Sequence, residues 1–187
     1  MARDWDELIS SADTSTDRSS LARAARRGTL VRLGSGIYTG LVDADPAEVV
    51  RRNMYSILEH ARPGLVITDA SSRTGQPRDG LLLVAAPDKL RDLDLPGLTV
   101  RVRRSPGPIP GDMQLAAGVH LASPARGLLD NLANARGAAA RVLPRTEVEA
   151  WVDNLLRDRG EQWLGRLRDE ARASAGCVTR RARLRHC

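Results

Sequence analysis

The sequence predicts an α+β fold, and three observations lead to this prediction. A short arginine-rich helical segment runs directly into two strand-like runs separated by Gly34-Ser35-Gly36. Short apolar runs follow between residues 65 and 122, at the spacing of a small sheet. Amphipathic segments without strand signals come after them. We therefore expect three parts: residues 1–42, a small α/β domain over residues 43–140, and a helical hairpin with a basic tail over residues 141–187.

The N-terminal part begins with two predicted helices. Residues 4–10 (DWDELIS) form a short amphipathic pattern, which predicts the first helix. The second helix follows Thr16 or Asp17, since either side chain can accept a hydrogen bond from a free backbone N–H, and it ends at Gly28. On a helical wheel, the apolar face of the second helix holds Leu21, Ala24, Ala25 and Gly28. The opposite face holds Ser19, Arg23 and Arg26.

A hairpin is predicted directly after the second helix. Thr29 to Leu33 and Ile37 to Thr39 are strand-like, and the glycines between them supply the positive φ angles of a tight turn. Two helices followed by such a hairpin have the sequence shape of a winged helix-turn-helix, with the hairpin as the wing. Short and cationic side chains on the second helix suit a recognition helix that enters a DNA major groove about 12 Å wide.

The middle of the chain combines one long helix with a small sheet. Asp45, Pro46 and Glu48 carry three helix-start signals, and the apolar spacing continues the helix to about His60. A short helix is predicted near Asp69 and another from Ser123-Pro124 to Leu132. The strands are expected in four apolar runs: LVIT, LLLVAA, LTVRVRR and GVHLA.

The C-terminal part is predicted to be helical. Residues 133–143 read as a loose connection, and Thr146 to Glu149 read as a capping box that starts a helix over 147–158. A further helix is expected over 161–175. The apolar residues that would join the two helices as a hairpin are Val148, Trp151, Val152, Leu155, Trp163, Leu164 and Leu167.

Charge and composition narrow the function classes. The formal net charge is +6, and the basic residues gather in 18–32, in RVRR at 101–104 and in RRARLR at 180–185. The absence of phenylalanine argues against a single-strand-binding surface built on aromatic stacking. No signal-peptide pattern or long apolar run is present, so we expect a cytoplasmic protein without a membrane partner.

Four stretches of the sequence resemble one known family. They read RGTLVRLGSGIYTG, VVRRNMYSIL, RPGLVITDASSRTG and HLASPARGLLDNL, in this order within residues 16–132. In order and spacing they resemble the AbiEi family of antitoxins from type IV toxin–antitoxin systems. The resemblance implies an N-terminal winged helix that represses its own operon and a C-terminal α/β domain associated with antitoxicity. It therefore implies operator DNA and a cognate toxin as partners.

A second resemblance leaves an alternative open. Residues 141–175 are similar to the stretch that precedes Fic domains in longer proteins, but the histidine-containing Fic motif is absent. The alternative function is thus a non-catalytic regulatory or adaptor module of a Fic-type enzyme, in which residues 141–187 dock a catalytic partner.

The candidate DNA-binding residues divide by the part of DNA that each would contact. Ser19, Arg23 and Arg26 are predicted to face base edges. Arg27, Arg32 and Ser35 are predicted to contact phosphates. One copy can cover only a half-site, so a homodimer on an inverted repeat is the economical arrangement. RVRR reads either as an ordinary exposed strand or as a basic surface that extends the DNA footprint or meets an acidic toxin.

The sequence offers no catalytic set. His60, His120 and His186 are scattered, and Cys177 and Cys187 with His186 do not complete a four-ligand zinc site. Ser71 and Ser72 lie where a helix cap is wanted and have no evident base. We therefore expect a protein that is not an enzyme, with no catalytic residues, no cofactor and no metal.

Overall fold

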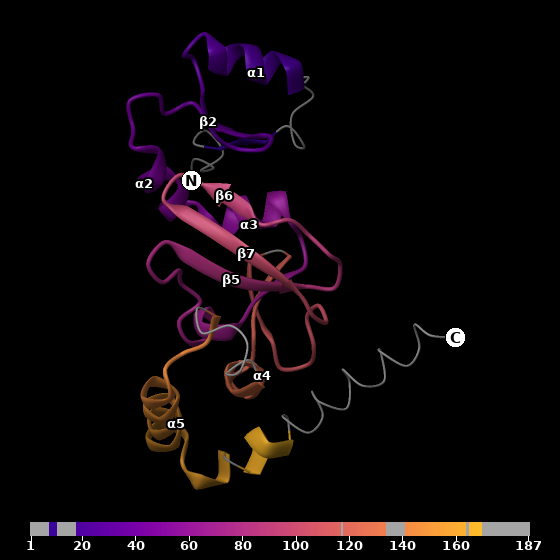
Figure 1. Cartoon of the computed structure of the whole chain (residues 1–187), viewed down its shortest axis with the longest axis vertical. Coiled ribbons are helices and arrows are strands. Elements are labelled where there is room, and N and C mark those ends of the chain that lie inside the picture. Colours follow the sequence, from indigo (N-terminus) through magenta and orange to yellow (C-terminus); the bar gives the residue numbers. More distant parts are fainter. Residues whose placement is uncertain (1–7, 11–17, 117, 134–140, 164, 170–187) are drawn as a thin grey trace, which may run out of the picture.

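The computed structural model has an α+β fold, which confirms the predicted class. It describes residues 8–10, 18–116, 118–133, 141–163 and 165–169. Figure 1 shows the elements arranged along the long axis, with α1 at one end, α5 at the other and the larger sheet between them.

In its described residues, 8–10 and 18–42, the N-terminal unit is one helix beside a three-stranded antiparallel sheet. Helix α1 (Arg18–Arg26) is followed by Gly28, whose φ of +77° is the left-handed conformation that commonly ends a helix. Gly36, also at φ +77°, lies in the turn between the two hairpin strands. The strands stand in the order β1-β3-β2. Their bounds are Ile9–Ser10 for β1, Val31–Gly34 for β2 and Ile37–Thr39 for β3.

The prediction of a first helix over residues 4–10 is wrong for residues 9 and 10. Ile9 and Ser10 form β1, which pairs with β3 so that Ile9 lies opposite Tyr38 and Ser10 opposite Ile37. The edge strand β3 of the hairpin has backbone groups available for pairing with these residues. This pairing with a strand distant in the sequence overrides the local helical pattern. Residues 4–7 and both candidate caps, Thr16 and Asp17, lie outside the described residues.

Two helices connect the N-terminal unit to the larger sheet. Helix α2 (Pro46–Arg52) begins as predicted: the Asp45 carboxylate accepts a hydrogen bond of 3.0 Å from the Ala47 N–H, and proline occupies the first turn. The single helix expected to His60 is instead broken at Asn53, after which α3 (Met54–Ala61) begins. The Asn53 amide donates to the Val49 carbonyl at 3.0 Å, and its backbone leaves the helical conformation at φ −106° and ψ 17°.

The larger sheet has six strands in the order β6-β7-β5-β4-β9-β8. β4 runs parallel to β9, β5 runs parallel to β7, and the β4–β5 pair is antiparallel. The four predicted runs all form strands. The sequence did not indicate β6 and β8, which are the two edge strands of the sheet and pair antiparallel with β7 and β9. The bounds are Leu65–Ile67 for β4, Leu81–Ala86 for β5, Leu93–Leu95 for β6, Leu98–Arg104 for β7, Met113–Ala116 for β8 and Val119–Leu121 for β9.

One hydrophobic cluster joins the N-terminal unit to the larger sheet. It includes Leu33 and Ile37 of the hairpin, Val50 of α2, Leu58 of α3 and Leu82 of β5. All of these side chains are buried. The two sheets therefore share one core rather than forming separate cores, and burial of this apolar surface is the main force that holds them together.

The other face of the sheet carries the remaining helices. The predicted short helix is the 3₁₀ helix η2 (Asp69–Arg73), and α4 (Pro124–Ala133) starts after Ser123, whose hydroxyl accepts a hydrogen bond from the Arg126 N–H at 3.2 Å. A second hydrophobic cluster joins α4 to α5 (Arg145–Arg159) and to residues of η2 and 141–144. Its buried members are Leu128, Leu143, Val148 and Trp151.

The C-terminal helices differ from the prediction at the start of α5. α5 begins at Arg145 after Pro144, so Thr146 is not its cap, and the Glu149 carboxylate instead accepts from Arg145 at 2.7 Å. Residues 161–163 and 165–169 are helical as expected. Leu167 joins the second cluster, so part of the predicted apolar set contacts the body of the protein; Leu164 lies outside the described residues. Within the described residues, no helix is long and apolar enough to span a membrane.

Candidate nucleic-acid interface

Helix α1 presents its basic side to solvent. Its buried residue is Leu21, at 5% exposure, and Ala24 and Ala25 are half-buried beside it. The predicted contact residues of the helix are exposed, as the helical wheel requires: Ser19, Arg23, Arg26 and Arg27. Arg23 and Arg26 lie in the last turn, where cations also interact favourably with the helix dipole.

The hairpin adds two further exposed candidates. Arg32 is exposed on β2, where its Nε donates to the Gly34 carbonyl at 3.1 Å, so its side chain lies along the strand toward the turn. Ser35 is exposed at that turn. The β2–β3 register shifts between Arg32 and Gly34, which indicates a bulge. A bulge bends the strand, and this one lies directly before the turn that holds Ser35. The structure thus brings the six candidate residues to one end of the molecule, on α1 and the adjoining hairpin (Figure 1).

The hairpin is held firmly against the larger sheet. A Cβ atom at Gly34 would lie 2.8 Å from Cδ2 of Leu95, so a larger residue here would displace the end of the Leu95 side chain, and glycine lets β2 approach β6 without that shift. Leu33 and Ile37 on either side of the turn are buried in the shared core. The exposed tip is therefore carried by a rigid base, which is the arrangement that a binding loop needs.

A buried ion-pair network is the most prominent polar feature outside this interface. Its centre is Asp69, whose side chain is fully buried and whose backbone has φ +52°, in the left-handed region. Nε of Arg103 donates to both Asp69 carboxylate oxygens at 3.1 Å. Nε and Nη2 of Arg141 donate to one of those oxygens at 3.0 and 2.8 Å. Two guanidinium groups therefore neutralise and satisfy one buried carboxylate.

The network continues through α4. Arg103 also pairs with Asp130 at 2.7 Å, and Thr68 donates its hydroxyl to the same carboxylate. Arg126 pairs with the fully buried carboxylate of Asp112 at 2.6 Å and donates to the carbonyls of residues 106 and 107. Each of these buried charges has a partner of opposite sign, so the network is a structural clamp between the sheet, α4 and residue 141.

The network changes the interpretation of RVRR. Alternation along β7 correctly puts Arg101 and Arg103 on one face, but Arg103 is only 22% exposed and its charge is taken up by Asp69 and Asp130. The predicted basic surface at 101–104 therefore does not include Arg103. The one sequence signal for the pairing was that Asp69 follows soon after β4 while Arg103 lies next to the end of β7, and spacing alone does not indicate that they meet.

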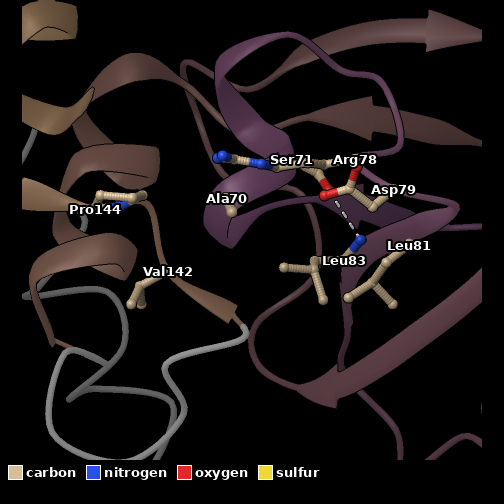
Figure 2. Close-up of a pocket in the computed structure, with 8 residues that line it drawn as sticks. All are labelled: Ala70, Ser71, Arg78, Asp79, Leu81, Leu83, Val142 and Pro144. Carbon is tan, nitrogen blue, oxygen red and sulfur yellow. Dashed lines mark hydrogen bonds between the residues drawn. The ribbon is translucent and has the colours of Figure 1, made fainter.

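A cavity of about 380 Å³ lies beside the network, on the same face of the sheet (Figure 2). Its lining includes Ala70 and Ser71 of η2, Leu81 and Leu83 of β5, and Val142 and Pro144 from the segment before α5. Arg78 and Asp79 complete it from the turn before β5. Arg78 forms two hydrogen bonds with Glu147 at 2.9 and 3.0 Å, and these bonds, followed by the attraction of the same carboxylate, raise the pKa of Arg78.

Three of the residues considered for catalysis, Ser71, Ser72 and His60, have hydrogen-bond partners in the structure. Ser71 Oγ accepts from the Leu83 N–H at 3.0 Å, and the Ser72 hydroxyl donates to the Asp69 carbonyl at 2.7 Å. Nδ1 of His60 lies 2.6 Å from the Ser56 carbonyl, while Nδ1 of His120 is buried without a hydrogen bond. No group of three His, Cys, Asp or Glu side chains that could hold a metal ion occurs among the described residues. His186, Cys177 and Cys187 lie outside them.

Comparisons with known proteins return no similarity: no protein-family model, no curated protein and no solved structure matches this chain.

Proposed function

We propose that this protein is a sequence-specific DNA-binding repressor of the AbiEi antitoxin type, in which α1 is the recognition helix and the β2–β3 hairpin is the wing. The observation that carries this proposal is the exposed polar side of α1 beside an exposed hairpin tip. Its members are Ser19, Arg23, Arg26, Arg27, Arg32 and Ser35. Catalysis has no part in the proposed function.

The chemistry of these side chains suits duplex DNA. Arginine can donate two hydrogen bonds to a guanine edge in the major groove, and small neighbours such as Ser19 and Ala22 let the helix approach closely. Arg27 and Arg32 would contact phosphates on either side of the groove, which fixes the orientation of the helix. Base readout thus belongs to Arg23 and Arg26, and sequence-independent affinity to the other cations.

The first prediction separates base readout from phosphate contact. Arg23→Ala and Arg26→Ala should each weaken binding to the operator by about 1–3 kcal/mol and relax sequence preference, whereas Arg32→Ala should weaken binding to all sequences alike. Fluorescence anisotropy with labelled upstream DNA and a scrambled duplex measures both effects. Arg157→Ala is the matched control, because Arg157 is also exposed but lies on α5 at the other end of the molecule (Figure 1). Wild-type affinity in Arg23→Ala and Arg26→Ala alike would exclude α1 as the recognition helix.

The second prediction concerns salt. If about four to six phosphates are neutralised per bound unit, the logarithm of the association constant should fall against the logarithm of salt concentration with a slope of roughly −4 to −5. Arg32→Ala should reduce the magnitude of that slope by about 1, while Arg157→Ala should leave it unchanged. Anisotropy titrations at several salt concentrations give these slopes. A flat salt dependence would contradict phosphate contact.

The antitoxin role rests on the family resemblance and needs its own test. We propose that the protein binds an inverted repeat upstream of its own gene as a pair of copies, and that it neutralises a toxin encoded beside it. Footprinting of the full chain on that upstream region should protect two half-sites about one helical turn apart. An absence of protection, together with binding of residues 141–187 to a Fic-type enzyme, would favour the adaptor function.

A further inference from the structure

The cavity between η2, β5 and residues 142–144 has the composition of a small-molecule site. Its volume, about 380 Å³, falls within the range of ligand pockets. Most of the lining is apolar: Ala70, Leu81, Leu83, Val142 and Pro144. A few polar groups accompany these walls, which is the usual distribution in small-molecule sites.

Ser71 supplies a hydrogen-bond donor to the cavity. Its side chain is nearly fully buried, at 2% exposure, and its oxygen already accepts from the Leu83 N–H, as the dashed line in Figure 2 shows. The hydroxyl hydrogen has no acceptor among the described residues. A buried donor that is left unused costs free energy, so a ligand atom that accepts from Ser71 would gain from it.

Asp79 supplies a negative charge at the edge of the cavity. Its side chain is exposed, and no hydrogen bond or ion pair joins its carboxylate to another residue in the described part of the chain. Its backbone has φ +50°, so the carboxylate is presented from a turn in the left-handed conformation. The neighbouring cation, Arg78, makes its hydrogen bonds to Glu147, so Asp79 interacts with Arg78 only through the weaker attraction of their charges and its carboxylate oxygens stay open to a donor.

From these contacts we propose that the cavity is a binding site for a small planar ligand with a nitrogen-donor head, such as an amidinium or an aminoheterocycle, on an apolar ring. The head donates to the Asp79 carboxylate, the ring contacts the walls of the cavity, and an acceptor atom of the ligand receives the Ser71 hydroxyl hydrogen. A ligand in this place touches η2 and β5 on one side and residues 142–144 on the other, so it stabilises their association.

Benzamidine and benzoate form a matched pair of probes, since they share size and shape but carry opposite charges. In ¹H–¹⁵N correlation spectra of the full chain, benzamidine should shift the amide signals of Ser71, Leu83 and Val142 saturably, with a dissociation constant in the millimolar range or below. Benzoate should bind at least about tenfold more weakly, because its carboxylate meets Asp79. Asp79→Asn should weaken benzamidine binding about tenfold, the loss expected for one charge-assisted hydrogen bond.

Two further variants keep the test decisive. Val142 is half-buried in the lining, so the large side chain of Val142→Trp should fill the cavity and abolish binding. Asp43→Asn removes an exposed carboxylate outside the cavity and should bind benzamidine as the wild type does. Far-ultraviolet circular dichroism checks that each variant is folded. Absence of saturable benzamidine shifts in the wild type, equal affinity for benzoate, or unchanged affinity in both Asp79→Asn and Val142→Trp would overturn the proposal.

Discussion

The Asp69→Asn protein is expected to lose about 3–5 kcal/mol of its free energy of unfolding, the usual cost of leaving buried charges unpaired. Asparagine keeps the size of the side chain and tolerates the φ of +52° at this position, so the change removes the charge and exchanges one acceptor oxygen for an NH2 group that cannot accept from an arginine. Arg103 would retain Asp130, but Arg141 would lose its only partner among the described residues. Both guanidinium groups would stay more than three-quarters buried.

Urea denaturation followed by tryptophan fluorescence measures this loss as a lower transition midpoint. Asp79→Asn is the matched control, because Asp79 also has a positive φ, at +50°, but its side chain is exposed. The control should lie within about 0.5 kcal/mol of the wild type. Similar effects of the two substitutions would mean that the ion pairs of Asp69 contribute no more than a surface carboxylate does.

The second large effect is expected at Gly127. This residue of α4 lies where a Cβ atom would come within 2.5 Å of Ser72 Oγ and 2.8 Å of Cη2 of Trp151. Ser72 and Trp151 are both buried, and Ser72 is held by its hydrogen bond to the Asp69 carbonyl. Gly127→Val adds three carbon atoms in this place, so α4 must move away from η2 and α5, at a cost of about 3 kcal/mol.

Gly165→Val is the control for the intrinsic effect of valine in a helix. Gly165 is also helical, but a Cβ there would meet no heavy atom within 4 Å. Since valine has a slightly higher helix propensity than glycine, this variant should unfold at the wild-type midpoint or slightly above it. Equal stability of the two variants in urea denaturation would show that α4 does not depend on the close approach at Gly127.

Elements with strong local signals were predictable from the sequence. The Asp45-Pro46 and Ser123-Pro124 starts depend on side chains that bond to backbone groups two or three residues away, and both helices begin there. The exposure of Arg23 and Arg26 opposite buried Leu21 likewise follows from helical periodicity. Their contact with DNA remains a prediction.

Features that depend on distant partners were not predictable. Strands β1, β6 and β8 are short and lie at sheet edges, where pairing rather than sequence decides the conformation. The Asp69 network joins residues 34 and 72 positions apart, and no spacing rule connects them. The helix break at Asn53 was not predictable either. The apolar pattern continues across it, and the break depends on one side chain that donates to a carbonyl of the preceding turn.

The close approach of Gly34 to Leu95 also has a practical consequence. DNA-binding segments are often studied as excised fragments, but a fragment ending near residue 42 would leave Leu33 and Ile37, buried at 3% and 4% exposure, open to water on one side. Such a fragment would tend to associate through that surface. A faithful truncation would have to retain the shared core through Val119 of β9, and a chimera that receives this hairpin would need β6 as well.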